Sequence, residues 1–220
     1  MKLEMGEFLA YSWLKHVKGC HVVQMNWKCP KIDTKDKLPK EFSELKKEFE
    51  MKFSDYDVFG KNKIGQFIKQ AECDVIGVKF MESEESIDHI FMVEVAFHKA
   101  GLNYKDKNNK GKGPVAKVLS KFIRLVFIWK LFFPNKHVTI IFATPKISHN
   151  HKENINKLLN KLREIIKSKE WDNVVIDFIS DEKFYSDIID ETNKKSKGYT
   201  DTSELYLRGK QLFELRDRKK

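Results

Sequence analysis

Runs of alternating and continuous apolar residues predict five β-strands along the chain, at residues 20–28, 72–80, 89–98, 137–145 and 173–180. Each run is rich in β-branched and aromatic residues and is bounded by polar or turn-forming residues, as is typical of strands in a folded sheet. The second and third runs are separated by the acidic stretch MESEESID. An antiparallel hairpin is therefore the simplest pairing for these two strands.

Apolar residues spaced three and four positions apart predict helices between these strands. The helical segments are, in chain order, 7–18, 39–53, part of 54–71, 115–133, 151–169, 181–195 and 203–220. Gly19 follows the first of them, and Pro114 and Pro134 bracket the fourth. Glycine after a helix and proline at either end are ordinary stop and start signals, so these boundaries are the best marked.

The order of these elements predicts an α/β fold in which a mixed β-sheet is flanked by helices. The hairpin supplies antiparallel neighbours, and the strand–helix–strand units after it would make right-handed crossovers to parallel partners. We expect one domain over residues 1–192, with an inserted helical region at about 30–70. A linker and a C-terminal helix would follow over residues 193–220.

The charge of the chain favours a polyanionic partner. Lys and Arg total 42 of 220 residues against 32 for Asp and Glu, which leaves a net charge of +10. Nucleic acid is the first partner to consider, and an anionic membrane surface is the second. A lysine-rich surface that serves only solubility remains the simplest alternative when charge is the sole observation.

The remaining composition predicts a cytoplasmic protein that does not span a membrane. Three widely spaced cysteines, Cys20, Cys29 and Cys73, form no CxxC pattern, and the opening MKLEMGEFLAYSWLKHVKGC carries charges where a signal peptide needs an apolar run. Charges also interrupt the most apolar stretch, residues 115–133. The chain lacks the motifs of P-loop nucleotide hydrolases, zinc proteases and serine hydrolases, so these activities have no support.

One carboxylate, Glu94, lies inside the strand pattern IFMVEVAFHK, where a charge is unexpected. Side chains alternate along a strand, and pairing about the turn brings Glu94 near Asp74 at the far end of the hairpin. Two carboxylates in an apolar setting repel each other unless a cation neutralises them. A divalent ion such as Mg²⁺ can do so, and a salt bridge to one of the many lysines is the alternative.

The segments GEFLAYSWLKHVKGCHVVQMNWK, AECDVIGV and IFMVEVAFH together resemble the PD-(D/E)XK nuclease superfamily, particularly its branch of archaeal Holliday-junction resolvases. In that branch a Gly-Glu pair opens the first helix, an Asn-Trp or similar pair closes the first strand, and Glu-x-Asp and Val-Glu-Val-Lys strands follow. The resemblance implies a restriction-endonuclease-like αβββαβ core with additional C-terminal elements. It implies that Asp74 and Glu94 bind Mg²⁺ or Mn²⁺ and that Glu7 assists them, with Glu72 a weaker candidate.

The chain departs from the family pattern at position 96, where the resemblance expects a lysine and the sequence has Ala96. Such a lysine orients the attacking water or stabilises negative charge on the phosphate. His98, on the same strand face, is one replacement. The following helix offers the other, because Lys117, Lys121 and Arg124 share one face there, and Lys121 or Lys117 is preferred.

A basic loop, KDKNNKGKG, follows the third strand. We expect lysines there and at the start of the next helix to contact DNA phosphates: Lys105, Lys107, Lys110, Lys112 and Lys117. A solvated loop without a ligand is the alternative.

The expected function is a metal-dependent DNA endonuclease, of restriction or mobile-element type, which hydrolyses phosphodiesters of duplex or branched DNA by Mg²⁺-activated water. A homodimer is one way in which such an enzyme could cut both strands. Because Ala96 replaces the expected lysine, a nuclease-like protein that binds nucleic acid without cutting it is the second hypothesis. A structural or regulatory protein whose charge is incidental is the third.

Overall fold

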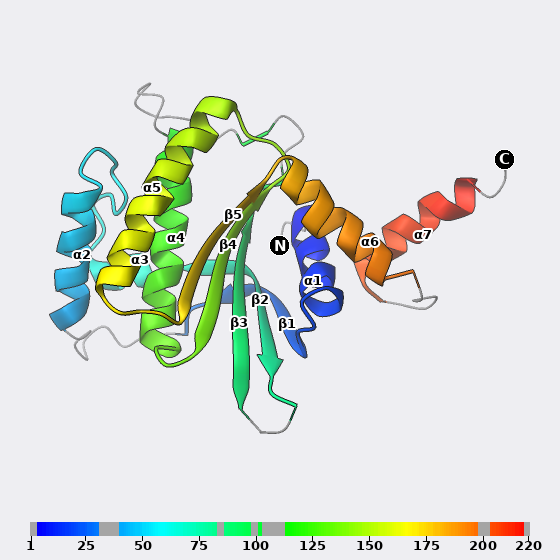
Figure 1. The fold of residues 1–220 in the computed structure, drawn as a ribbon, viewed down its shortest axis with the longest axis horizontal. Coiled ribbons are helices and arrows are strands. Elements are labelled where there is room, and N and C mark those ends of the chain that lie inside the picture. The colour runs from blue at the N-terminus through cyan, green and yellow to red at the C-terminus, as the bar shows by residue number, and fades with distance from the viewer. Residues whose placement is uncertain are drawn as a thin grey trace.

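The computed structural model describes residues 4–30, 40–82, 86–97, 101–102, 113–197 and 203–217. Within these residues the chain forms an α/β fold with a five-stranded mixed sheet between two layers of helices (Figure 1). The strands are β1 (Val22–Lys28), β2 (Glu72–Phe80), β3 (Ile87–Val95), β4 (His137–Thr144) and β5 (Val174–Ser180). Every strand predicted from the sequence is present.

The strands lie in the sheet in the order in which they occur in the chain. β2 is antiparallel to both β1 and β3, which confirms the predicted hairpin. β3, β4 and β5 run parallel to one another, joined by helical crossovers. β1 and β5 are therefore the two edge strands, and β2 and β3 lie side by side inside the sheet.

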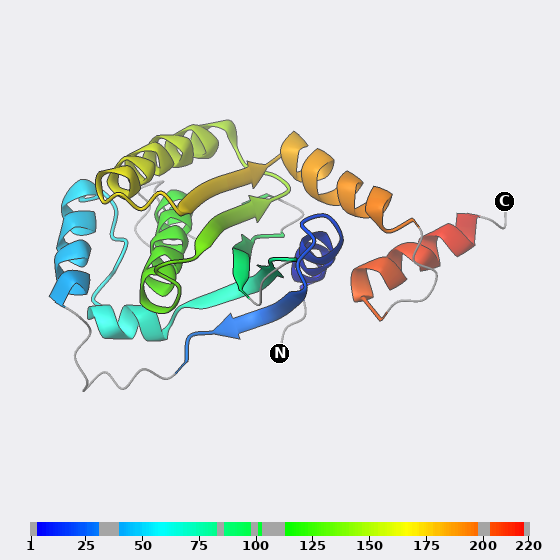
Figure 2. The ribbon, with the colours of Figure 1, turned by 60° about the horizontal axis from the view of Figure 1, so that its bottom comes forward.

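Helices cover both faces of this sheet (Figures 1 and 2). On one side lie α4 (Gly113–Phe132) and α5 (His149–Ser168), with α2 (Lys40–Lys52) and α3 (Ile64–Lys69) packed beyond them. On the other side lie α1 (Met5–His16), the π-helical segment η1 (Phe184–Asp190) and α6 (Glu191–Lys195). The last helix, α7 (Leu205–Asp217), extends past α1 toward the C-terminus.

Each face has its own hydrophobic core. The larger core joins the sheet to α4 and α5, and the smaller one joins it to α1 and η1. Phe127 of α4 is the centre of an aromatic cluster in the larger core, with four rings from α2, α3 and the segment between them within 6.2 Å: Phe42, Phe49, Phe59 and Phe67. This cluster fixes the inserted region on α4.

The helices agree with the pattern prediction except near their ends. α1 begins at Met5 rather than at residue 7, and the inserted region expected at about 30–70 contains α2 and α3. The expected boundary after residue 192 falls inside α6, which continues directly from η1. In the described parts of the chain, no helix combines the length and apolar character needed to cross a lipid bilayer.

Candidate functional site

β2 and β3 bring the carboxylates of Asp74 and Glu94 together. The antiparallel register pairs Val75 with Val93, so Asp74 and Glu94, one step further along, lie opposite each other. Glu94 is only 3 % exposed. The Asp74 side chain is held in place because the Val95 amide donates a hydrogen bond of 2.8 Å to its Oδ2. The two strands thus have the arrangement that the alternation of side chains predicts.

Lys121 of α4 supplies a cation to this pair. Its Nζ contacts Glu94 Oε2 directly and lies 3.7 Å from Asp74 Oδ2. A helix that packs across the sheet can deliver such a side chain, because the long aliphatic stem of lysine packs against apolar neighbours while its ammonium group reaches a charged partner. Of the two lysines that the sequence favours for this role, the structure brings Lys121 to the carboxylates.

Ala96, where the family pattern has a lysine, is enclosed just past the end of β3. It is 2 % exposed and belongs to the larger hydrophobic core. Its amide donates to the carbonyl of Ala143 at 2.9 Å, and its carbonyl accepts from Thr144 Oγ1 at 2.9 Å. The amine at this site therefore comes from the helix above the sheet and not from the strand itself.

Burial makes ionisation of the carboxylate pair unfavourable. Burial raises the pKa of the Glu94 carboxyl to about 8, against the attraction of Lys121, and the negative charge of Asp74 raises it as well. A buried carboxyl with a raised pKa gains more from a nearby positive charge than an exposed one does, because little water competes. The pair is ionised most easily when a cation lies beside it.

Glu7 approaches the pair from α1, on the other side of the sheet. Its side chain is buried, and its Oε2 accepts a hydrogen bond of 3.1 Å from Asn26 Nδ2. Burial raises the pKa of Glu7, the hydrogen bond from Asn26 opposes this, and the charge of Asp74 raises it again. Glu7 and Asp74 therefore interact electrostatically, and the contact that fixes the Glu7 side chain is the one with Asn26.

Gly6 allows α1 to come this close. A Cβ atom at position 6 would lie 2.6 Å from Cβ of Phe97 and 2.8 Å from Cγ1 of Val95, both inside van der Waals contact. Only glycine fits where the helix meets the end of β3 at this distance. The Gly-Glu pair thus has a physical explanation. Gly6 lets α1 pack closely against the end of β3, and Glu7, the next residue, accepts a hydrogen bond from Asn26.

Asn26 is a member of the site that the sequence did not single out. It lies in β1 with φ of 52°, a left-handed conformation that is rare within a strand and that asparagine tolerates better than most residues. The register passes from the pair Met25–Val75 to the pair Trp27–Cys73, so Asn26 lies level with Asp74. The Asn-Trp pair in the sequence was the available signal, but only the backbone shows why the asparagine turns toward Glu7.

The donor set suits a hard cation that keeps most of its water. Across the described ranges, no group of three or more His, Cys, Asp or Glu side chains is gathered closely enough to hold a metal ion. Mg²⁺ and Mn²⁺ need no such cage, because one or two carboxylates suffice when water and substrate oxygens complete the octahedron. Asp74 and Glu94 fit that requirement, and Glu7 can accept a hydrogen bond from a bound water.

The other predicted residues have different positions. Lys117 lies one turn before Lys121 and is exposed, and its pKa is lowered by burial of part of the side chain and by the charges of Lys121 and Arg124. Glu72 forms a surface ion pair of 3.7 Å with Lys28. The remaining candidates lie outside the described residues: His98, Lys105, Lys107, Lys110 and Lys112.

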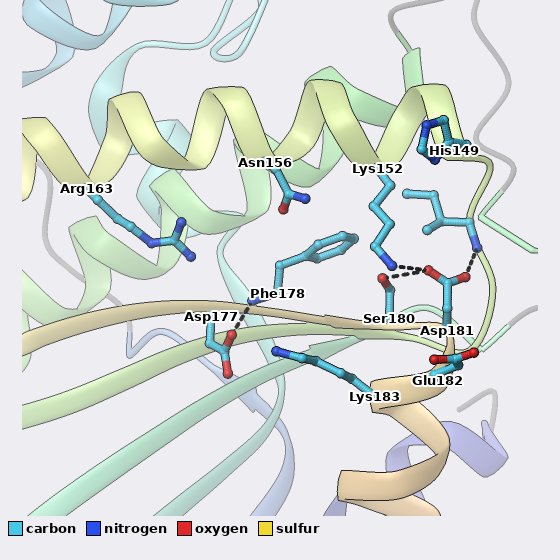
Figure 3. A pocket seen from close by; sticks show the side chains of 11 residues that line it. His149, Lys152, Asn156, Arg163, Asp177, Phe178, Ser180, Asp181, Glu182 and Lys183 are labelled. Atoms are coloured by element: carbon cyan, nitrogen blue, oxygen red, sulfur yellow. Dashed lines mark hydrogen bonds and ion pairs between the residues drawn. The ribbon is translucent and has the colours of Figure 1, made fainter.

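A separate cavity of about 700 Å³ lies between α5 and β5 (Figure 3). Its main charges are already paired, since Lys152 Nζ lies 2.7 Å from Asp181 Oδ2. Arg163 donates to the carbonyl of Ile176 at 2.9 Å, and the Phe178 amide donates to Asp177 Oδ1 at 2.8 Å. The bond from Arg163 ties α5 to the edge strand, and the Lys152–Asp181 pair ties α5 to the residue that follows it. The cavity contains none of the predicted catalytic, metal-binding or DNA-contacting residues.

Comparison of the chain with protein-family models, with curated proteins and with solved structures finds no match. The assignment of a function therefore depends on the geometry of the carboxylate site and on the resemblance of short motifs. Among the described residues, the strongest grouping of chemically useful side chains is the one formed by Glu7, Asn26, Asp74, Glu94 and Lys121.

Proposed function

We propose that the protein is a metal-dependent DNA endonuclease with a restriction-endonuclease-like core. The observation that carries the proposal is the position of the Lys121 ammonium group beside the opposed carboxylates of Asp74 and Glu94. It supplies, from α4, the amine that the family pattern has at position 96. The element order α1, β1, β2, β3, α4, β4 supports an αβββαβ core, with α2 and α3 inserted after β1.

In this proposal Asp74 and Glu94 bind Mg²⁺ or Mn²⁺. When bound, the ion would supply Lewis-acid chemistry, lowering the pKa of a water and drawing charge from the phosphodiester. Lys121 would stabilise the negative charge that develops on the phosphate, which a nearby ammonium group does best when it is held in place beforehand. Glu7 would orient a water molecule, and the hydrogen bond from Asn26 would fix the direction of its carboxylate.

The substrate is duplex or branched DNA, and the net charge of +10 supports a polyanion as the partner. Lys117 is exposed on the α4 face that carries Lys121, so it can contact phosphate beside the site. A protein of this kind is of restriction or mobile-element type. Cutting both strands would need two sites, which a homodimer provides.

Plasmid cleavage tests the endonuclease proposal. Supercoiled plasmid is incubated with the wild-type protein and Mg²⁺ or Mn²⁺, and nicked and linear forms are measured on gels. Asp74→Ala and Glu94→Ala should abolish both products, and Glu164→Ala, which removes an exposed carboxylate on α5, should retain them. If the two site variants cut as fast as the wild type, the assigned site is wrong.

A nuclease-like protein that binds nucleic acid without cutting it is the second candidate. Two observations favour it: Ala96 is enclosed in the core, and Lys121 forms an ion pair with Glu94. Calorimetry with Mn²⁺ separates the two functions. The endonuclease requires a site that Asp74→Ala removes, whereas the second candidate predicts no measurable heat of binding together with salt-sensitive binding of DNA.

A further inference from the structure

Arg124 lies three residues after Lys121 on the same face of α4, so the two side chains are neighbours on the helix surface. It is half-buried, and its guanidinium carbon lies 4.8 Å from the centre of the Phe67 ring, in a cation–π contact. Its Nε atom is buried and has no hydrogen-bond partner. Sequence reasoning placed Arg124 on this face but gave it no role.

No ion pair joins Arg124 to a carboxylate of the described residues. Burial lowers the pKa of its guanidinium, and the negative charge of Glu94 opposes that shift. Arg124 therefore interacts electrostatically with Glu94 although the two are not bonded. A partly buried charge with an unsatisfied donor is costly when nothing compensates it. An anion close to the guanidinium would compensate its charge.

Phe67 is a rigid platform for the guanidinium. It is fully buried, its ring centre lies 4.6 Å from that of Phe59, and it also packs edge-on against Phe127. The cation–π contact keeps the guanidinium close to this ring. An arginine held in one position in this way can donate two parallel hydrogen bonds to the oxygens of one phosphate.

The inserted region is tied to the site helix close to Arg124. Ser120 Oγ, one turn before Arg124 on α4, donates a hydrogen bond of 2.8 Å to the carbonyl of Val58. This bond anchors the segment between α2 and α3, and the aromatic cluster around Phe127 anchors α3 itself, so the Phe67 ring has a fixed position relative to α4. The insertion is thus packed against the helix that carries Lys121 and Arg124.

We infer that Arg124 binds a backbone phosphate of the nucleic acid next to the phosphate at the carboxylate site, and that Phe67 positions its guanidinium. The inference rests on the proposed function for its nucleic-acid partner. Arg124 is then a substrate-binding residue and Phe67 a positioning residue. The inserted helices take part in substrate binding, because they supply the ring on which the guanidinium lies.

Binding of a short fluorescein-labelled DNA duplex tests the inference. Anisotropy titrations are made with the full chain in EDTA, so that no cleavage occurs, and are repeated over a series of KCl concentrations. Arg124→Gln should raise Kd about tenfold, the loss expected for one charge-assisted bond. It should also make the slope of log K against log[KCl] shallower by about 0.9, which corresponds to one phosphate contact.

Two further variants separate the effect of the shape and position of the Arg124 guanidinium from the effect of its charge. Arg124→Lys keeps the charge but loses the planar fork, and Phe67→Leu keeps the arginine but removes the ring. Both should retain the wild-type salt slope and bind DNA more weakly. Lys161→Gln removes one charge from an exposed position on α5 and should leave both quantities unchanged. Thermal melting of each variant shows whether it is folded.

Wild-type Kd and salt slope in Arg124→Gln would overturn the inference, as would equal losses in Lys161→Gln. If Arg124→Gln does not fold, the test is made with Arg124→Lys. Wild-type affinity for DNA in that variant would show that the planar guanidinium is not needed and would overturn the inference.

The proposed endonuclease function and the role of Arg124 can be refuted independently of each other. A wild-type protein that binds DNA through Arg124 but never cuts it refutes the endonuclease alone, and one that cuts without needing Arg124 refutes this inference alone. Failure of the wild type to bind DNA at low salt removes both.

Discussion

The ammonium group of Lys121 on α4 contacts the carboxylate of Glu94 on β3, across 27 residues of sequence. This contact joins the helical layer to the sheet at the only buried acidic residue within the described strands. Loss of this partner would make ionisation of the buried carboxyl still more costly. The pair is consequently where changes in charge should have their largest effects.

Replacement of Lys121 separates its catalytic role from its structural one. Lys121→Ala should lower the rate of plasmid nicking by about 10²–10³-fold, the usual cost of removing one group that stabilises charge in a transition state. Binding of Mn²⁺ should be retained or strengthened in the same variant, because the carboxylates lose their competing cation. Nicking assays and calorimetry measure the two quantities.

Lys157→Ala, on the exposed face of α5, is the matched control for loss of one lysine and should change neither quantity. Undiminished nicking by Lys121→Ala would show that the lysine serves only to neutralise the pair.

Glu94 should make stability depend on pH. Its pKa of about 8 in the folded protein exceeds the ordinary value of 4.5, so the folded state holds a proton that the unfolded state has released. Its contribution to stability is fully present below pH 4.5 and is lost as pH rises to about 8, at up to about 1.4 kcal/mol per unit. Glu94→Gln cannot titrate and should show a flatter dependence across that range.

Urea unfolding at a series of pH values in EDTA measures this difference. The groups that interact with Glu94 include Lys121, Asp74, Arg124 and Cys73, and all four are retained in the variant. Parallel curves for the wild type and Glu94→Gln would show that Glu94 is ionised throughout.

Gly6→Ala tests the close approach of α1 to β3. The added methyl group would meet Phe97 and Val95 at less than 3 Å and should destabilise the fold by about 1–3 kcal/mol, as overpacking generally does. Because Glu7 follows directly, nicking should fall as well. Gly209→Ala on α7 has open space around the new methyl group and should instead stabilise the helix by about 0.5–1 kcal/mol. Chemical denaturation measures the free energy of unfolding of both variants, which should fall in Gly6→Ala and rise in Gly209→Ala. Equal changes in the two variants would argue against the close approach of α1 to β3.

Glu204 should hold α7 on α1 in a pH-dependent way. Its carboxylate accepts hydrogen bonds from Ser12 at 2.7 Å and Lys15 at 2.8 Å and lies 2.9 Å from His16 Nε2. Burial raises the pKa of Glu204, but these three partners together hold it below 4.5. The stabilisation is therefore present above pH 4.5 and is lost as pH falls through the folded pKa.

Hydrogen exchange of the α7 amides measures the docking. Protection should fall in acid in the wild type, and Glu204→Gln should lower it at neutral pH by an amount that corresponds to about 1–3 kcal/mol. Glu191→Gln, which affects only a surface pair with Lys194, is the control. Protection that does not change in Glu204→Gln would show that apolar contacts alone hold the helix.

Local patterns predicted most of the fold. Alternation of side chains located all the strands and placed Asp74 close to Glu94, because a hairpin register depends on nearby residues. The choice between His98 and a helix lysine could not be made from the sequence, since it depends on how α4 crosses the sheet.

Contacts between distant segments explain what the sequence did not reveal. The left-handed backbone of Asn26 arises where β1 meets both α1 and β2, and the stacking of Arg124 on Phe67 requires the inserted helices to fold back onto α4. Neither relationship leaves a periodic signal along the chain, so only tertiary packing could show it.

The hydrogen bonds along β5 have a consequence for assembly. An edge strand normally offers free amides and carbonyls to a further strand, but Arg163 and Asp177 already occupy the carbonyl of Ile176 and the amide of Phe178. Another copy of the chain would have to break these bonds before it could extend the sheet at this edge. A dimer that cuts two DNA strands would therefore not form by pairing its β5 edges, which leaves β1 as the other edge strand of the sheet.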